Sequence, residues 1–157
     1  MANTKTLHGQ SGGTINATDY FQAALDHADS LATLYAGGHY ALTLYVSGLA
    51  AECLFRAFRA KKGLPFRSDH SLELLAKEAG FPDLVPQGRR ERYDAALSNL
   101  IIRWHNVHRF RSNVAAQRFL KDRKLDRKID GNYLKTNAKL LSSGAIELVN
   151  LGVLKWH

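Results

Sequence analysis

Apolar residues recur along most of the chain at spacings of three and four, which is the pattern of amphipathic helices. The predicted helices run from Asp19 to about Ala36, from His39 to about Lys62, from Leu72 to about Ala79, from Gln87 to about His108 and from Asn132 to Asn150. No segment shows the period-two alternation of a strand. The pattern therefore predicts an all-α fold, an up-and-down bundle of four to five helices.

Polar segments set the expected limits of this bundle. Residues 1–16 are rich in Gly, Ser, Thr and Asn and predict a flexible N-terminal arm, with Thr18 as N-cap of the first helix. Residues 17–157 have the length of a single domain with one core. Residues 112–131 are polar and basic, and their pattern leaves helix and loop both open. A small-residue patch in the second helix, around Gly48, predicts close approach of another helix backbone.

The overall composition is that of a soluble globular protein, with 45% hydrophobic and 23% charged residues. No apolar run approaches the roughly 20 residues of a membrane span, and the N-terminus lacks the apolar core of a signal peptide. The single cysteine, Cys53, cannot form an internal disulfide. We therefore expect a cytoplasmic protein that does not associate with membranes.

Charge is distributed unevenly along the chain. Residues 1–85 contain seven Lys and Arg against eight Asp and Glu, whereas residues 86–157 contain fifteen against six, giving −1 and +9. Such an excess favours a polyanionic partner such as RNA or a nucleotide, because cations at phosphates release condensed counterions. The alternative is a solvated basic face that only aids solubility.

The basic part holds a pair suited to RNA cleavage, with Arg103 five residues before His108. A guanidinium group can hold the phosphate while an imidazole transfers protons near neutral pH, without a metal. On an ideal helix the two side chains lie about 140° apart, so they converge only if the helix loosens near Asn106 or a second subunit contributes. The alternative is that Arg103 is solvated and His108 interacts with the helix C-terminus.

Four other groups of residues are candidates for chemistry. Glu52, in the middle of the second helix, either pairs with Arg56 one turn on or reaches and orients an arginine or histidine of the fourth helix. The spacing of His105 and His108 fits one face of a zinc site, but further ligands lack a recognisable spacing. We therefore expect no metal and no cofactor. Trp104 and Phe110 are either core or interface residues or platforms for RNA bases. Cys53 lies on an apolar stripe, which disfavours a nucleophile.

Three segments together resemble HEPN domains (higher eukaryotes and prokaryotes nucleotide-binding domains). They are the small-residue helix with an Ala-Glu pair at residues 40–54, the Asp-His-Ser-Leu-Glu-Leu-Leu turn at residues 69–75, and Trp-x4-Arg-Phe-Arg-Ser at residues 104–112. Their order matches that of the family, and the resemblance covers roughly residues 18–152. It implies an up-and-down helical bundle that often forms a homodimer.

The resemblance also implies a function. Many HEPN proteins are metal-independent endoribonucleases of toxin–antitoxin and phage-defence systems, and Arg103 and His108 match their Arg-x4-6-His motif. By this reading His108 and Arg103 are catalytic and Glu52 orients them. Further contacts to RNA or its phosphates come from Trp104, His105, Arg109 and Arg111. Other members are non-catalytic modules that bind nucleotides or RNA, often beside a nucleotidyltransferase or as antitoxin-like partners. That alternative is favoured by Trp104, which stands where the family commonly has a polar residue.

Overall fold

The computed structural model of the protein describes residues 14–157, so most of the predicted N-terminal arm lies outside the described residues. Within the described residues the chain forms helices and connecting turns without strands. The helices are α1 (Ala17–Ala36), α2 (Tyr40–Lys61), α3 (Leu72–Glu78), α4 (Phe81–Leu84), α5 (Arg90–Arg103), α6 (Asn113–Asp122) and α7 (Tyr133–Lys155), with 3-10 turns η1 (Gln87–Arg89) and η2 (Asn106–Phe110). The all-α prediction is confirmed.

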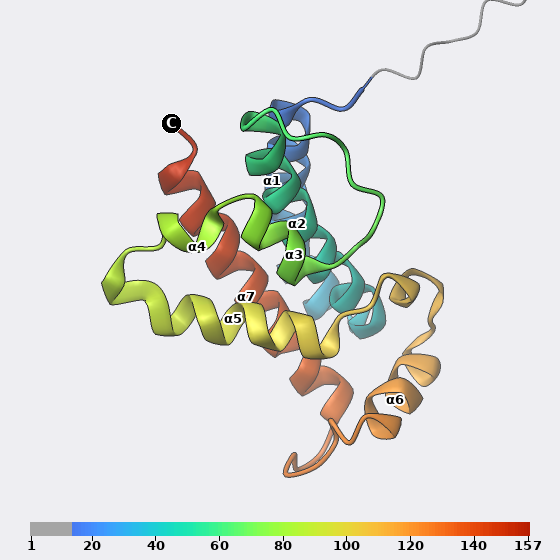
Figure 1. Ribbon diagram of the computed structural model, residues 1–157. Helices are drawn as coiled ribbons and strands as arrows, with labels where there is room; N and C mark the ends of the chain where they lie inside the picture. The colour runs from blue at the N-terminus through green and yellow to red at the C-terminus, as the bar shows by residue number, and fades with distance from the viewer. Residues whose placement is uncertain (1–13) are drawn as a thin grey trace, which may run out of the picture.

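Four long helices, α1, α2, α5 and α7, form the core of the domain. The ends of α2 and α7 lie together, because Lys61 donates a hydrogen bond to the carbonyl of Trp156. The ring of Phe21, near the start of α1, stacks on Trp156 at 4.2 Å, so α1 runs antiparallel to both. Figure 1 shows α5 crossing α7 obliquely. The arrangement therefore departs from a simple up-and-down bundle at α5.

The described residues contain two helices, α4 and α6, in addition to the five that were predicted. Gly80 adopts a left-handed conformation with φ of 66°, which ends α3 and starts the short α4. The second addition is α6, in the segment whose pattern left helix and loop open. Only Ala116 and Leu120 are buried in this ten-residue helix, so its apolar pattern is one short i,i+4 pair within a basic segment.

Helix α1 starts two residues earlier than expected. Asn16, and not Thr18, is the N-cap, since its side chain accepts the backbone N–H of Asp19 at 2.9 Å. The Asp19 side chain in turn accepts the backbone N–H of Asn16, which completes a capping box. The Thr18 assignment was therefore wrong, because a reciprocal pair of caps satisfies two backbone donors where Thr18 would satisfy one.

Helix α2 lies at the centre of the domain. It is long and apolar enough to span a membrane by length and composition, with a mean hydropathy of 1.3, but 83% of that stretch is buried inside the protein. Its buried residues also include Glu52, Arg56 and Arg59, which a membrane span would rarely carry. Core burial accounts for the apolar character of this helix.

At Gly48 the small-residue patch of α2 accommodates a side chain. A Cβ atom at Gly48 would lie 2.1 Å from the indole ring of Trp104. Trp104 is only 7% exposed, and its Nε1–H donates to the carbonyl of Tyr45 at 3.0 Å. We predicted that a helix backbone approaches this patch closely; at Gly48 the group that approaches is the indole ring of Trp104.

This contact ends α5 at Arg103. Trp104 has an extended conformation, with φ of −88° and ψ of 142°, and the chain resumes helical geometry only in η2. The predicted continuation of the helix to His108 was therefore wrong. Its local sequence permits a helix, but insertion of Trp104 into α2 redirects the backbone.

We predict that Gly48→Ala destabilises the protein by about 1–3 kcal/mol, because the added methyl group overpacks against the buried indole of Trp104. This loss exceeds the helix-propensity gain of up to about 1 kcal/mol for replacing a glycine. Urea unfolding measures the difference. The matched control is Gly88→Ala, where a Cβ meets no atom within 4 Å and the free energy changes by less than about 1 kcal/mol. Equal stability of the two variants would contradict the packing described.

Candidate nucleic-acid interface

The segment after α5 is fixed by caps at both ends. His105 is the N-cap of η2, and its Nδ1 accepts the backbone N–H of Val107 at 3.1 Å. Ser112 caps α6 by accepting the backbone N–H of Ala115. Asn113 accepts the backbone N–H of Ala41 at 3.0 Å, which ties the start of α6 to the start of α2. These bonds give the basic segment a defined conformation on the α2 side of the bundle.

His108 is buried, with 1% of its surface exposed, and both ring nitrogens have partners. Its Nε2–H donates to the carbonyl of Arg103 at 2.8 Å, and its Nδ1 accepts from the Nη1 of Arg111 at 2.9 Å. Burial is the main cause that lowers the pKa of His108 to about 4; the charges of Arg111, His105 and Arg123 act in the same direction, and the hydrogen bond to the carbonyl of Arg103 opposes them. The ring is therefore neutral near pH 7 and caps the last carbonyl of α5.

Arg103 directs its guanidinium group away from His108 and toward α7. Its Nε donates to Asn137 Oδ1 at 2.7 Å, and its Nη1 donates to Asn99 Oδ1 at 2.8 Å. Burial lowers the pKa of Arg103. The structure thus brings Arg103 and His108 together through a backbone carbonyl, and their side chains do not face a common substrate position within one chain.

Glu52 takes a partner on its own helix and one in the following loop. It accepts from Arg56 Nε at 2.8 Å, and Nδ1 of His70 lies 3.0 Å from each of its carboxylate oxygens. It therefore has no hydrogen bond to α5, and the alternative of an i,i+4 pair with Arg56 is correct. The contact with His70 was missed, although a buried acid that precedes a loop histidine is a usable signal. Trp104, expected to contact RNA, belongs to the core.

The aromatic ring of Phe119 carries an unusual group of cations. The guanidinium carbons of Arg111 and Arg123 lie 4.3 and 4.5 Å from its centroid. Burial and the charge of Arg123 lower the pKa of Arg111. Burial and the charges of both arginines lower the pKa of His105. We call Arg111 and Arg123 the Phe119 cation cluster; the two like charges repel each other, and His105 lies near both.

No carboxylate offsets this cluster. Every ion pair within residues 14–157 lies between Glu52 and Glu78 in the sequence. The basic surface comprises the Lys and Arg side chains of η2, α6 and the turns that follow each of them, namely Arg109, Arg111, Arg118, Lys121, Arg123, Lys124, Arg127 and Lys128, with His105 beside them. Three aspartates, Asp122, Asp126 and Asp130, share this region but approach none of these cations to salt-bridge distance. The surface therefore presents uncompensated positive charge.

An exposed aromatic ring adjoins the basic surface. Phe110 is 74% exposed, and the guanidinium carbon of Arg109 lies 4.6 Å from its ring centroid. Large exposed rings cost free energy in water unless a ligand covers them. A phenyl ring beside an arginine is a suitable platform for an unstacked base.

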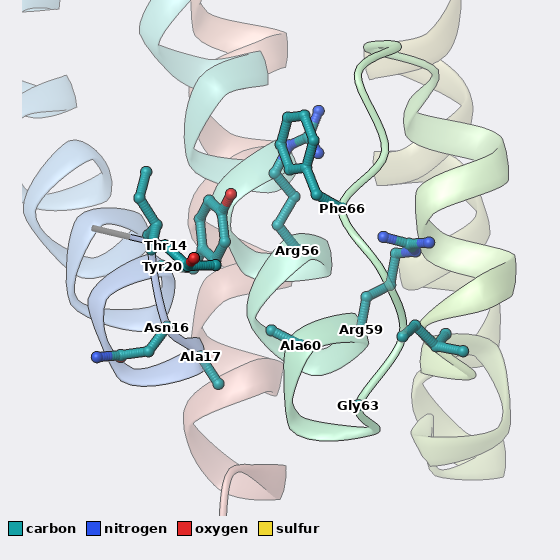
Figure 2. Close-up of a pocket in the computed structure, with 11 residues that line it drawn as sticks. Thr14, Asn16, Ala17, Tyr20, Arg56, Arg59, Ala60, Gly63 and Phe66 are labelled. Carbon is teal, nitrogen blue, oxygen red and sulfur yellow. The ribbon is translucent and has the colours of Figure 1, made fainter. Parts of the chain in front are cut away.

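A cavity of about 490 Å³ lies near the C-terminal end of α2, between α1 and the loop that follows α2 (Figure 2). Its two arginines are engaged by that loop. Arg56 donates to the carbonyl of Asp69, Arg59 donates to the carbonyl of Pro65, and the ring of Phe66 covers Arg56 at 5.1 Å. These guanidinium groups hold the loop and contribute little free charge to the cavity.

The described part of the chain contains no assembled site for metal binding or for thiol chemistry. No group of three or more His, Cys, Asp or Glu side chains is placed to hold a metal ion there. Burial raises the pKa of Cys53 to about 12, and the charge of Glu52 contributes. The thiol is therefore protonated near neutral pH and a poor nucleophile.

No family model, curated protein or solved structure matches the chain. The functional interpretation therefore depends on the geometry and charges of these residues.

The buried His108 predicts a specific dependence of stability on pH. The unfolded chain binds the His108 proton below about pH 6.5, whereas the folded protein binds it only below about pH 4. Stability therefore falls as the pH decreases through this window, by up to about 3 kcal/mol in total. His108→Gln retains a donor and an acceptor but does not titrate, so it loses less stability on acidification than the unmodified protein.

Urea unfolding at about pH 7 and about pH 4.5 measures this difference. His39→Gln is the matched control, since His39 is exposed and its side chain makes no capping hydrogen bond. The control retains the full pH dependence. If His108→Gln and the unmodified protein lose equal stability, then His108 is not the buried neutral cap described.

Proposed function

We propose that the protein binds single-stranded RNA through the basic surface and does not cleave it. The observation that carries this proposal is the Phe119 cation cluster, in which two guanidinium groups share one ring without a carboxylate partner. A phosphate bound between them would relieve their mutual repulsion and release counterions. The exposed Phe110 beside Arg109 supplies a stacking platform, which favours single-stranded nucleic acid.

Cleavage is disfavoured by the state of His108. A general acid or base needs a nitrogen that reaches the reacting oxygen, and a pKa near the working pH. Both nitrogens of His108 are occupied, and its pKa is about 4. The proposal is thus of the non-catalytic kind found among the HEPN domains that the sequence resembles, with a cytoplasmic location and self-association as parts of the same expectation.

Charge reversal tests the binding surface. We predict that Arg123→Glu weakens binding of a fluorescent oligouridine strand by at least about tenfold at fixed salt, because it removes one phosphate contact and adds repulsion. It also reduces the steepness of the salt dependence. Arg92→Glu is the control, since it makes the same change at an exposed position near the start of α5, at the other end of that helix from η2. Equal affinities of the two variants, measured by fluorescence anisotropy, would show that the basic surface is not the RNA-binding site.

Incubation of RNA with the protein tests the absence of cleavage. We predict that RNA stays intact in EDTA at high protein concentration, because both ring nitrogens of His108, the histidine of the Arg-x4-His pair, are occupied within the fold. Gel electrophoresis of end-labelled RNA reads the outcome. Degradation that disappears in His108→Gln would show that His108 leaves its buried position and acts as a ribonuclease residue.

A further inference from the structure

A cavity of about 200 Å³ lies where the start of α3 meets the end of α5. Its lining residues are His70, Ser71, Leu72, Glu73, Ile101 and Trp104. Trp104 lines the cavity and directly precedes His105, which lies near Arg111 and Arg123, so the cavity adjoins the basic surface. In Figure 1 the first turn of α3 lies beside the last turns of α5.

The buried carboxylate of Glu52 fixes the orientation of the His70 ring at this cavity. Both carboxylate oxygens lie 3.0 Å from His70 Nδ1, and Arg56 holds the same carboxylate at 2.8 Å. A neutral imidazole that donates its Nδ1–H presents Nε2 as an acceptor. Nε2 has no hydrogen-bond partner within residues 14–157, and the side chain is 44% exposed. In its neutral form the ring thus offers an oriented acceptor to a ligand.

The lining chemistry selects an uncharged ring with hydrogen-bond donors. Glu73, which forms no ion pair within the described part of the chain, adds a second acceptor to that of His70. Its negative charge disfavours phosphate in the cavity. Trp104 and Ile101 supply apolar walls, which suit a flat ring.

Guanine is the base whose edge fits two acceptors. It presents the N1–H and N2–H2 donors side by side, whereas adenine and cytosine pair a single amino group with a ring-nitrogen acceptor, and uracil has one N–H between two carbonyls. We propose that this cavity binds a guanine base, which His70 Nε2 and the Glu73 carboxylate hold through N1–H and N2–H2. The inference rests on the proposed RNA binding, in which the basic surface holds the backbone while one base enters the cavity.

Intrinsic fluorescence tests the cavity without an RNA strand. In a Trp156→Phe background, Trp104 is the only tryptophan, and guanosine bound against it changes its emission. Inosine lacks the 2-amino group and binds about tenfold more weakly. His70→Ala and Glu73→Gln each weaken guanosine binding, whereas the control His39→Ala, at an exposed histidine outside the cavity, does not. Because Glu73 is exposed, Glu73→Gln leaves the fold intact. It therefore tests the guanine site even if His70→Ala does not fold.

An unchanged emission with guanosine, or equal binding of inosine, overturns the guanine site. Fluorescence anisotropy then separates this site from the basic surface, using oligouridine and the same strand with one central guanosine. The guanosine strand binds more tightly, Glu73→Gln removes the difference, and Arg123→Glu weakens both strands. Equal binding of the two strands overturns the guanine site and leaves RNA binding intact. If guanosine alone binds but neither strand does, then the cavity stands and the proposed RNA binding fails.

Discussion

The insertion of Trp104 into the small-residue face of α2 is the contact on which the remaining local structure depends. The indole occupies the space left by Gly48 and is held by the carbonyl of Tyr45. By pulling the backbone off the axis of α5, it leaves the carbonyl of Arg103 without a helical partner, and His108 fills that need. Trp104 therefore determines two neighbouring features. One is the His108 cap next to the basic surface, and the other is a wall of the cavity at the start of α3.

Charge is segregated in three dimensions as well as along the chain. Acids and arginines near the end of α2 are paired and mostly buried, where they cost little because each has several hydrogen bonds. The cations that follow α5 have aromatic rings as neighbours, since rings can attract a cation without neutralising it. The first arrangement stabilises the fold, and the second keeps charge available for a ligand.

Most helices could be predicted because their apolar spacing is a local signal, as in α1, α2, α3, α5 and α7. The end of α5 could not, because it depends on contact between Trp104 and Gly48, far apart in sequence. The pairing of Glu52 with Arg56 was among the predicted alternatives, being set by helix geometry, whereas His70 reaches Glu52 through a loop. Arg103 and His108 were singled out as a catalytic pair from their spacing, but their burial and their separate hydrogen bonds are tertiary properties. An aromatic residue among cations, Phe119, was the unused signal for the cluster.

The loop between α2 and α3 is anchored through its main chain. Arg56 binds the carbonyls of Arg67 and Asp69, and Arg59 binds the carbonyl of Pro65. Because every residue type offers the same carbonyl oxygen, these three contacts do not depend on the loop's side chains, in contrast to the ion pairs that Arg67 forms with Asp69 and Glu78. Mutation can therefore alter the residues that precede the cavity without loosening the loop, so ligand preference can drift during evolution while the scaffold stays constant.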